Sequence, residues 1–311
     1  MARRHLFDQE TSRMHYDAII IGGSFAGLSA AMQLARARRK VLVIDAGLPR
    51  NRFAEASHGF LGQDGKAPHE IMREGRRQLL LYPTVEFIDG MAVRARQEDQ
   101  HFSVTLADGR EAEGSKLILA IGRRDELPAI PGLEERWGAT VLHCPYCHGY
   151  EVAGRQLGVL ANHPGSPHQG LLIPDWGPTT YFTQGTFEPS EEEAAGMIAR
   201  GAVIERTPIV ACLGPAPRLE GVRLADGRIL PVEAIFTASK THMASPLAEQ
   251  LGCAFDAGMT GPILRVDDWK QTTVPGVYAA GDAANPMHNA TLASASGVLA
   301  GVAAHRSLFM P

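Results

Sequence analysis

Two cysteines separated by two residues are the groups in this 311-residue chain with the clearest chemical potential. Cys144 and Cys147 can close into a disulfide and reopen, so one short segment can store two electrons. Pro145 suits the first turn of a helix. A helix starting there would direct its partially positive end at the thiols and favour the reactive thiolates. His143 and His148 flank the pair, and either histidine could move a proton to or from a departing sulfur.

Half of a zinc site and an inert cysteine pair are the alternatives to a redox-active disulfide. Structural zinc sites usually add a second pair of Cys or His ligands at close spacing. The remaining cysteines, Cys212 and Cys253, lie far apart in the sequence and have no such partner nearby. His163 and His168 also lack a third ligand, and we expect both to be solvated loop residues. We therefore predict a redox-active pair and no metal site.

The elements expected to position a cofactor begin near the N-terminus. Residues 16–21 predict a buried strand, the small residues 26–36 a helix, and residues 40–44 a second strand that ends at Asp45. This βαβ unit is the context that a dinucleotide-binding fingerprint requires. The turn within it provides Gly22, Gly23, Ser24, Ala26 and Gly27. A serine there is small enough to leave the backbone near a pyrophosphate, and Asp45 lies where a carboxylate accepts hydrogen bonds from the adenosine ribose.

The C-terminal part of the chain supplies the second half of this nucleotide site. Residues 273–282 predict a turn and a short strand with Asp282 at its carboxyl end, and a helix of small residues follows from about Ala290. Asp282 could hold the ribityl hydroxyls of a flavin, and the amides that open the helix would face the pyrimidine end of the ring. Residues 116–121 predict a third buried strand, which ends in a glycine turn. Both ends of the chain thus build one FAD-binding domain.

We predict an α/β fold with two dinucleotide-binding domains, in which a Rossmann-like domain is inserted into the FAD domain. Residues 1–124 and 240–311 would form the FAD-binding domain, with residues 1–15 flexible. Residues 125–239 would form the inserted domain that carries the CxxC, and residues 125–131, with two prolines, a stiff linker. Ser190, followed by three glutamates, predicts the start of an exposed helix.

Bulk composition limits the other classes of function. The net charge of -4 and the isoelectric point near 6.3 favour neither nucleic acid nor an acidic membrane surface as a partner. No segment is long and apolar enough to cross a bilayer, and four cysteines do not make a secreted disulfide scaffold. We therefore expect a cytoplasmic protein.

The order of these motifs resembles that of the low-molecular-weight thioredoxin reductases. The resemblance spans the chain after Tyr16 and rests on the glycine turn, residues 120–122, the CxxC and residues 281–282. The sequence CPYCHGYE and residues 181–185 are closer to the reductase-like flavin dithiol oxidases, which close disulfides in gliotoxin, holomycin and related natural products. His148 takes the place of the aspartate that generally follows the CxxC in reductases.

The resemblance implies a set of residues that contact FAD. These are Gly22, Gly23, Ser24, Ala26, Gly27, Asp45, Arg50, Asn51, His58, Val93, Ala120, Gly122, Gly281, Asp282 and Ala290. His58 and His288 are the weaker candidates for positions near the ring, and an ordinary polar role is the simpler interpretation of both.

The inserted domain departs from the reductases where they bind NADPH. Their first strand in this domain is followed by a glycine turn, whereas here residues 156–161 are followed by NHPGSPH. The next strand, residues 180–184, ends without the arginine pair that would hold a ribose 2′-phosphate. We interpret the loop as a ruined nucleotide site, and an atypical loop that still binds NADPH is the alternative.

These features predict a FAD-dependent thiol oxidase that converts a small-molecule or peptide dithiol into a disulfide, with O2 as electron acceptor and H2O2 as product. The family implies that Cys144 is the exposed sulfur and that Cys147 faces the flavin. His148 is the favoured proton shuttle, His143 the alternate, and a homodimer the expected assembly. The rival hypotheses are a disulfide reductase fed by NADPH or by a protein donor such as ferredoxin, and a non-catalytic flavin-binding redox sensor.

Overall fold

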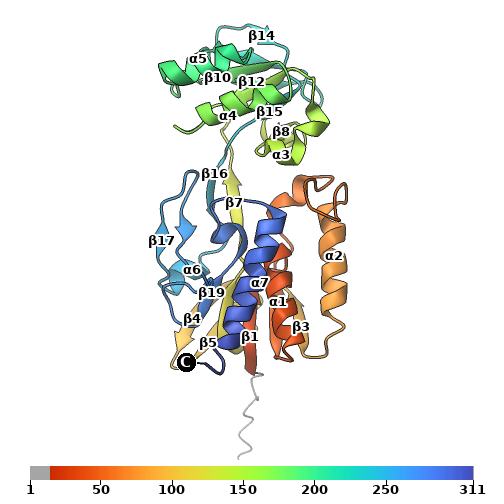
Figure 1. The fold of residues 1–311 in the computed structure, drawn as a ribbon, viewed down its shortest axis with the longest axis vertical. Helices are drawn as coiled ribbons and strands as arrows, with labels where there is room; N and C mark the ends of the chain where they lie inside the picture. Colours follow the sequence, from red (N-terminus) through yellow and green to blue (C-terminus); the bar gives the residue numbers. More distant parts are fainter. Residues whose placement is uncertain (1–14, 311) are drawn as a thin grey trace, which may run out of the picture.

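The computed structural model describes residues 15–310 and has two lobes, one above the other in Figure 1. The terminal lobe, below, contains residues 15–122 and 244–310, and the inserted lobe, above, contains residues 127–239. The N-terminal segment expected to be flexible lies, except for His15, outside the described residues. The α/β fold with an inserted second lobe agrees with the prediction.

The terminal lobe is organised around a seven-stranded sheet to which both ends of the chain contribute. The strand order is β3-β2-β1-β6-β5-β4, and β19 also pairs with β6. Strands β3, β2, β1, β6 and β19 pair in parallel, whereas β4 and β5 form an antiparallel extension. The strands are β1 (His15–Ile21), β2 (Val41–Asp45), β3 (Val85–Asp89), β4 (Ala92–Glu98), β5 (His101–Leu106), β6 (Glu111–Leu119) and β19 (Val277–Ala279).

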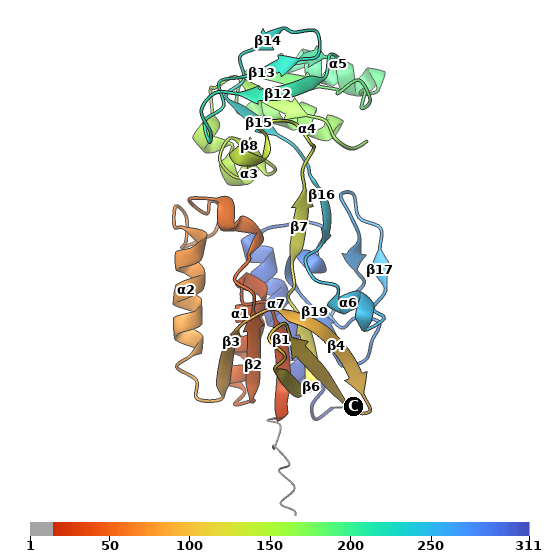
Figure 2. The ribbon, with the colours of Figure 1, turned by 180° about the vertical axis from the view of Figure 1, so that it is seen from behind.

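The second half of β1, residues 18–21, is apolar and buried because both faces of the sheet are covered there. Ile19 and Ile21 belong to the hydrophobic core on one face, and Ala18 and Ile20 to the core on the other. The second core includes the helices α1 (Phe25–Arg36) and α7 (Ala290–Arg306), whose bounds agree with the predicted helices within one residue. Figure 2 shows these helices behind the sheet.

Small residues let α1 and α7 approach each other closely. A Cβ atom on Gly297 would lie 2.1 Å from the carbonyl oxygen of Ala26, and one on Gly301 would lie 2.5 Å from that of Ala30. The remaining elements of this lobe are α2 (Pro68–Leu79), α6 (Leu247–Gln250), β17 (Phe255–Asp256), β18 (Ile263–Leu264), and the 3-10 turns η1 (Arg50–Phe53) and η5 (Gly281–Ala283).

The inserted lobe contains a five-stranded parallel sheet of order β11-β10-β9-β15-β8, next to a three-stranded antiparallel sheet, β12-β13-β14. Its strands are β8 (Val141–Leu142), β9 (Leu157–Leu160), β10 (Thr179–Phe182), β11 (Val203–Glu205), β12 (Ile209–Leu213), β13 (Gly221–Leu224), β14 (Ile229–Leu230) and β15 (Ala234–Phe236). Its helices and 3-10 turns are α3 (Pro145–His148), α4 (Pro167–Leu172), α5 (Glu191–Ala199), η2 (Glu134–Arg136), η3 (Tyr150–Val152) and η4 (Ile173–Asp175). Ser190 caps α5 in a reciprocal capping box with Glu193, which confirms the predicted helix start.

The two lobes are joined by a strand pair rather than by the loop expected at residues 125–131. Strand β7 (Arg123–Glu126) pairs with the antiparallel strand β16 (Lys240–Met243), and Asp125 lies opposite Thr241. Both views show these strands side by side between the lobes (Figures 1 and 2). The linker prediction was therefore wrong for its first two residues, because their hydrogen-bond partners come from a distant segment. We propose that the domains divide within this ribbon, at residues 125 and 240.

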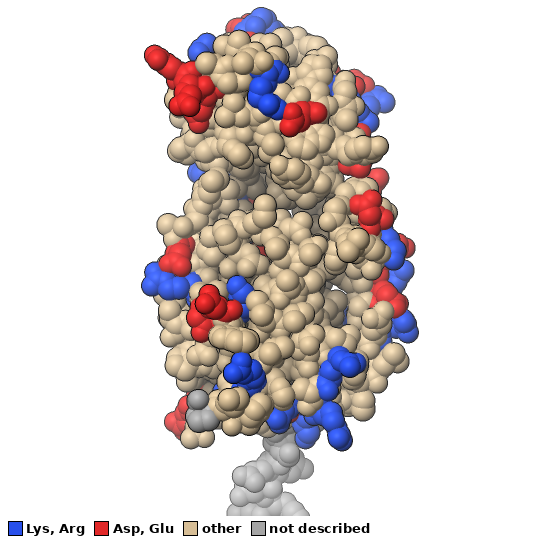
Figure 3. All heavy atoms as spheres, viewed as in Figure 1, with Lys and Arg blue, Asp and Glu red and all other residues tan. Residues whose placement is uncertain are grey.

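Charged side chains are scattered over the face of the molecule that Figure 3 shows. On the face seen in Figure 3, basic and acidic side chains are interspersed, and the surface narrows between the lobes. Within residues 15–310, no helix has the length and apolar character needed to cross a membrane.

Candidate active site

A cavity of about 1480 Å³ lies between the two lobes. Its lower wall includes the turns that follow β1, β2 and β6, the carboxyl ends of parallel strands where open α/β sheets bind ligands. Its upper wall includes residues of the CxxC segment. The cavity exceeds the about 300–1,000 Å³ of ordinary ligand pockets. It therefore has room for a large ligand and for a second, smaller molecule.

The glycine turn after β1 is shaped by close backbone contacts. Gly22 has a φ of 106°, and a Cβ there would lie 2.2 Å from the carbonyl oxygen of Ala120. A Cβ on Gly27 would lie 1.8 Å from the carbonyl oxygen of Gly22. These positions therefore require glycine. The N–H of Gly23 donates a hydrogen bond to Oδ1 of Asp45, at 3.0 Å, so the turn and the acid that ends β2 lie side by side.

The other end of the cavity is formed by η5 and the start of α7. Asp282 and Ala290 both line the cavity. We expected the first amides of this helix to face a flavin, but Asn289 Oδ1 accepts hydrogen bonds from the N–H groups of Thr291, at 2.8 Å, and Leu292, at 3.4 Å. Asparagine acts here as the N-cap residue and already supplies a hydrogen-bond acceptor to these two amides.

Arg50 connects several charged groups at this end of the cavity. Its Nε and Nη2 donate to the two carboxylate oxygens of Asp125, at 2.8 and 2.6 Å, and its Nη1 donates to Asp282 Oδ2 at 3.2 Å. Nη1 also lies 2.6 Å from Nδ1 of His288. Because a guanidinium only donates, this ring nitrogen must accept. Burial and the charge of Arg50 lower the pKa of His288 to about 3, so this imidazole is neutral at physiological pH.

Burial and hydrogen bonding shift the pKa of the Asp125 carboxyl group in opposite directions. Burial raises the pKa of its carboxyl, but the hydrogen bonds and charge of Arg50 outweigh burial and hold the pKa below its ordinary value. Asp125 is therefore an anion paired with Arg50. We had assigned it only to the linker, and its one sequence signal is its position shortly after the glycine turn that ends β6.

Cys144 and Cys147 form a disulfide at the start of α3. Pro145 occupies the first turn of this helix, as predicted. Cys147 lines the cavity, whereas Cys144 is outside its lining. Tyr146 of this helix contacts Trp176 edge-on, with ring centroids 5.7 Å apart. The disulfide therefore presents one sulfur-bearing residue to the cavity.

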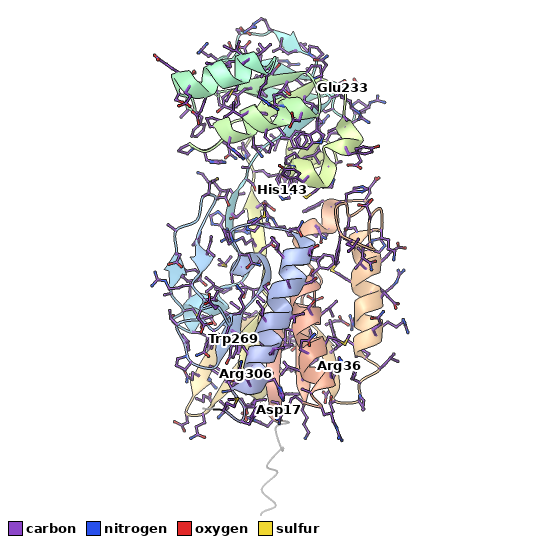
Figure 4. All side chains as sticks on the ribbon, viewed as in Figure 1. Asp17, Arg36, His143, Glu233, Trp269 and Arg306 are labelled. Atoms are coloured by element: carbon purple, nitrogen blue, oxygen red, sulfur yellow. A yellow bond between two sulfur atoms is a disulfide. The ribbon has the colours of Figure 1, made fainter. Side chains whose placement is uncertain are left out.

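The histidines beside the disulfide differ in their electrostatic surroundings. Burial, together with the charge of Arg50, lowers the pKa of His143 to about 3. Figure 4 shows His143 at the base of the inserted lobe, on the side of the terminal lobe. Burial also lowers the pKa of His148, but Glu151 acts against this shift. A carboxylate favours the protonated form of each ring, Asp125 for His143 and Glu151 for His148, but burial and the charge of Arg50 outweigh Asp125 at His143.

His58 links the two lobes electrostatically. Its Nε2 lies 3.5 Å from a carboxylate oxygen of Glu151 in η3, and its Nδ1 lies 3.7 Å from Asp64. The ring also influences His148, whose pKa it lowers. His58 is therefore a half-buried residue at the lobe interface.

The structure brings nearly all the predicted site residues to one cavity. Gly27 and Cys144 are the exceptions, and each lies next to the lining. The residues that line the cavity are Gly22, Gly23, Ser24, Ala26, Asp45, Arg50, Asn51, His58, Val93, Ala120, Gly122, His143, Cys147, His148, Gly281, Asp282 and Ala290.

The loop after β9, where the reductases have their second glycine turn, is closed by its own side chains. The buried hydroxyl of Ser166 accepts hydrogen bonds from the N–H groups of Asn162 and His163, at 3.1 and 3.2 Å. His163 is only 8% exposed, and its Nδ1 accepts from the N–H of Gly165 at 3.0 Å. The prediction of a solvated His163 was therefore wrong, because the loop folds back over the ring. His168 is exposed, as expected.

In the part of the chain that the structure describes, no group of three or more His, Cys, Asp or Glu side chains could hold a metal ion.

Fold and site together define a flavin-linked disulfide oxidoreductase. Residues 16–159 and 203–297 match the family model of the pyridine nucleotide-disulphide oxidoreductases. The chain belongs to this family, and it acts as an oxidoreductase on disulfides or dithiols. Its cofactor is FAD, and the glycine turn, Asp45 and Asp282 along one cavity fit that molecule.

Individual relatives confirm the resemblance to thioredoxin reductases. The chain is 32% identical over 303 residues to thioredoxin reductase tcpT of Claviceps purpurea, with 94% of each protein covered. It is 30% identical to thioredoxin reductase sirT of Leptosphaeria maculans, with 92% of each covered. The crystal structure of an oxidoreductase from Agrobacterium tumefaciens has a TM-score of 0.92 and 49% identity, and covers 96% of this chain and 100% of its own.

Proposed function

We propose that this protein is a thiol oxidase that converts a small dithiol into a disulfide and uses O2 as the electron acceptor. The observation that carries the proposal is a contrast between two sites. Cys147 lines the same cavity as the predicted flavin contacts, whereas the loop that would bind NADPH is closed by Ser166. A dithiol therefore has a route for electrons to the flavin, and NADPH lacks a phosphate cradle.

The reaction uses the two cysteines in sequence. A substrate thiolate attacks Cys144 and forms a mixed disulfide, and Cys147 departs as a thiolate. The second substrate thiol attacks the mixed disulfide, so the oxidised substrate leaves and Cys144 and Cys147 remain reduced. Two electrons and two protons thus enter the enzyme for each disulfide made. Bound FAD would supply the route by which these two electrons reach O2, which takes up the two protons and becomes H2O2.

His148 is the proton carrier in this proposal, rather than His143. A pKa of about 3 makes His143 too weak a base to hold a proton near neutral pH. The pKa of His148 is also below its ordinary value, but Glu151 and the thiolate of the opened disulfide would both stabilise its protonated form. His148 can therefore take a proton from the incoming thiol and return it to a leaving sulfur.

FAD would be held along the length of the cavity by the residues predicted from the sequence. The turn from Gly22 to Gly27 would receive the pyrophosphate, Asp45 the adenosine ribose, and Asp282 the ribityl hydroxyls. The apolar side chains that line the cavity include Phe53 of the terminal lobe and Ile130 and Trp137 of the inserted lobe. An apolar lining of this kind favours a small substrate with apolar surface over a protein substrate.

A disulfide reductase remains the second candidate, because the curated relatives carry the name thioredoxin reductase. Anaerobic reduction of the yellow protein separates the two. We expect a small dithiol such as dithiothreitol to bleach the flavin and NADPH to leave it oxidised. Admission of air should restore the colour and release about one H2O2 per dithiol consumed, because two electrons are transferred. Bleaching by NADPH but not by dithiols would establish the reductase instead.

We further propose a cytoplasmic homodimer, as the family resemblance implies. Leu292, Val298 and Leu299 are partly exposed apolar residues on α7, with 41, 38 and 39% exposure, and they supply a surface for a second copy. Sedimentation of the holoprotein would give the oligomeric state directly.

A further inference from the structure

The 3-10 turn η1 (Arg50–Phe53) touches both the inserted lobe and the ribbon that leads to it. Arg50 binds Asp125 on β7. Phe53 packs against Gly138 in the inserted lobe so closely that a Cβ on Gly138 would lie 2.6 Å from the Cβ of Phe53. The whole turn also lines the cavity. One short segment of the terminal lobe therefore meets the flavin site and the inserted lobe at once.

Asp125 ties both connecting strands to this turn. It lies on β7, and its Oδ1 also accepts a hydrogen bond from the hydroxyl of Ser239, the residue that precedes β16. The Arg50 and Asp125 side chains are 15% and 8% exposed, and two parallel N–H···O bonds join them. Bidentate, sheltered pairs of this kind are the strong ion pairs in proteins.

The same guanidinium also holds a residue of the flavin site. Arg50 Nη1 donates to Asp282 Oδ2, at 3.2 Å. Arg123, His143 and His288 are the other charged or titratable groups whose electrostatics are coupled to this cluster. Arg50 thus binds both the ribbon, through Asp125, and Asp282, and Arg123 on β7 adds a hydrogen bond from its Nε to the backbone oxygen of Asp282 at 2.8 Å.

We propose that the Arg50–Asp125 pair is a lock that holds the inserted lobe in the orientation in which Cys147 faces the flavin. A two-stranded ribbon alone can twist or bend, but a carboxylate fixed to Arg50 and Ser239 holds both strands to the terminal lobe. Asp125 is a positioning residue in this proposal, since it acts through the ribbon. The inference holds for an oxidase or a reductase, because both need the CxxC beside the flavin.

The test uses a signal that depends on the distance between sulfur and flavin. In Cys144→Ser, Cys147 is left as a lone thiolate, and a thiolate against an oxidised flavin gives long-wavelength charge-transfer absorption. Asp125→Asn in this background removes the charge but keeps the shape of the side chain. We expect this double variant to lose about half or more of the charge-transfer absorbance. The loss would follow because, without the ion pair, fewer molecules hold the lobe orientation that places Cys147 beside the flavin. Small-angle X-ray scattering should show the lobes rearranged.

The matched control is Glu126→Gln on the next residue of β7. Glu126 pairs with His242 across the same ribbon, but both side chains are about half exposed, at 56% and 47%. Exposed pairs contribute little. We therefore expect charge-transfer absorbance and scattering to stay unchanged in this variant. FAD content and melting temperature measured on every variant separate a change of orientation from a loss of cofactor or fold.

Asp125→Asn with full charge-transfer absorbance and unchanged scattering would overturn the lock. If that variant does not fold or does not keep FAD, Ser239→Ala in the same Cys144→Ser background takes its place as the test. Ser239 is outside the lining of the cavity, so its replacement removes no residue that lines the flavin site. A smaller loss of the absorbance in Ser239→Ala, with FAD retained, would support the proposal. No loss would overturn it.

Discussion

The hydroxyl group of Ser166 accepts a hydrogen bond from the backbone N–H of Asn162 at the carboxyl end of β9, over 3.1 Å. The following amide, that of His163, donates to the same oxygen. In a nucleotide-binding turn such amides face the phosphates. Here a side chain of the loop itself satisfies them, and Pro167 at the start of α4 offers no amide hydrogen. An incoming pyrophosphate would therefore lack the donors that it needs.

NADPH should accordingly reduce the flavin very slowly or not at all. Stopped-flow spectroscopy near the flavin absorption maximum measures this reaction, and bleaching of the same sample by a dithiol is the control. Ser166→Gly frees both amides, but we expect no gain, because the arginine pair for the 2′-phosphate is still missing. Saturable reduction by NADPH at about 1 s⁻¹ or faster, the range of ordinary enzymes, would contradict the prediction.

Asp282 should matter more than Asp45 for retention of the flavin. Asp282→Ala removes the expected ribityl contact and one partner of Arg50, whereas Asp45→Ala removes contacts at the adenosine end. A hydrogen bond to a charged group contributes about 1.5–3 kcal/mol, so FAD affinity should fall about 10- to 100-fold in Asp282→Ala. Equilibrium dialysis with FAD fluorescence measures the affinity.

Asp108→Ala is the control for the flavin-retention test. Asp108 pairs with Arg110, and both residues are exposed and lie outside the lining of the cavity. Its affinity for FAD should equal that of the unaltered protein. An equal effect of Asp45→Ala and Asp282→Ala would show that contacts near the ring do not dominate.

The sequence predicted the parts of the site that depend on local pattern. The glycine turn, Asp45 and the N-terminus of α7 are set by residues close in the chain. Most predicted strand and helix bounds agree with the structure within two residues, but β6 begins at Glu111 rather than at residue 116. Asp125 was missed because its partners are distant: Arg50 lies 75 residues away and Ser239 114 residues away. Local composition there, two acids followed by prolines, favours a linker.

Two side-chain roles were missed for similar physical reasons. Asparagine is a favoured N-cap residue and Asn289 caps α7, a role that we did not assign because we expected the helix amides to face the flavin. His163 was expected in solvent because histidine and proline in a short loop usually face water. The loop instead closes on Ser166 and buries the ring.

Cys144→Ser and Cys147→Ser should both abolish dithiol oxidation but should differ in colour. Cys147 lines the cavity and Cys144 does not. The variant that keeps Cys147 should therefore show long-wavelength charge-transfer absorption, and the variant that keeps Cys144 should not. Visible spectra after anaerobic thiol reduction and desalting compare the two. The reverse pattern would exchange the roles of the cysteines and leave the reaction unchanged.

His148→Ala should slow reduction of the flavin by a dithiol by about 10²- to 10⁴-fold, the usual loss for a general acid–base group. The acting base is the neutral imidazole. Because burial lowers the pKa of His148, this form predominates at neutral pH and is lost as the pH falls through a value below the ordinary about 6.5. The rate in the unaltered protein should therefore fall on the acid side, and His148→Ala should lack that limb. Stopped-flow rates across the pH range measure both effects.

Reoxidation of the reduced flavin by O2 should change much less in His148→Ala, because this step needs no proton transfer to or from a cysteine. His168→Ala is the matched control, since His168 is an exposed histidine of the inserted lobe outside the lining of the cavity. It should keep both the rate and the acid limb. A wild-type rate and pH dependence in His148→Ala would remove His148 from the mechanism. His143 would then be the next residue to replace, although its pKa of about 3 makes it the weaker base.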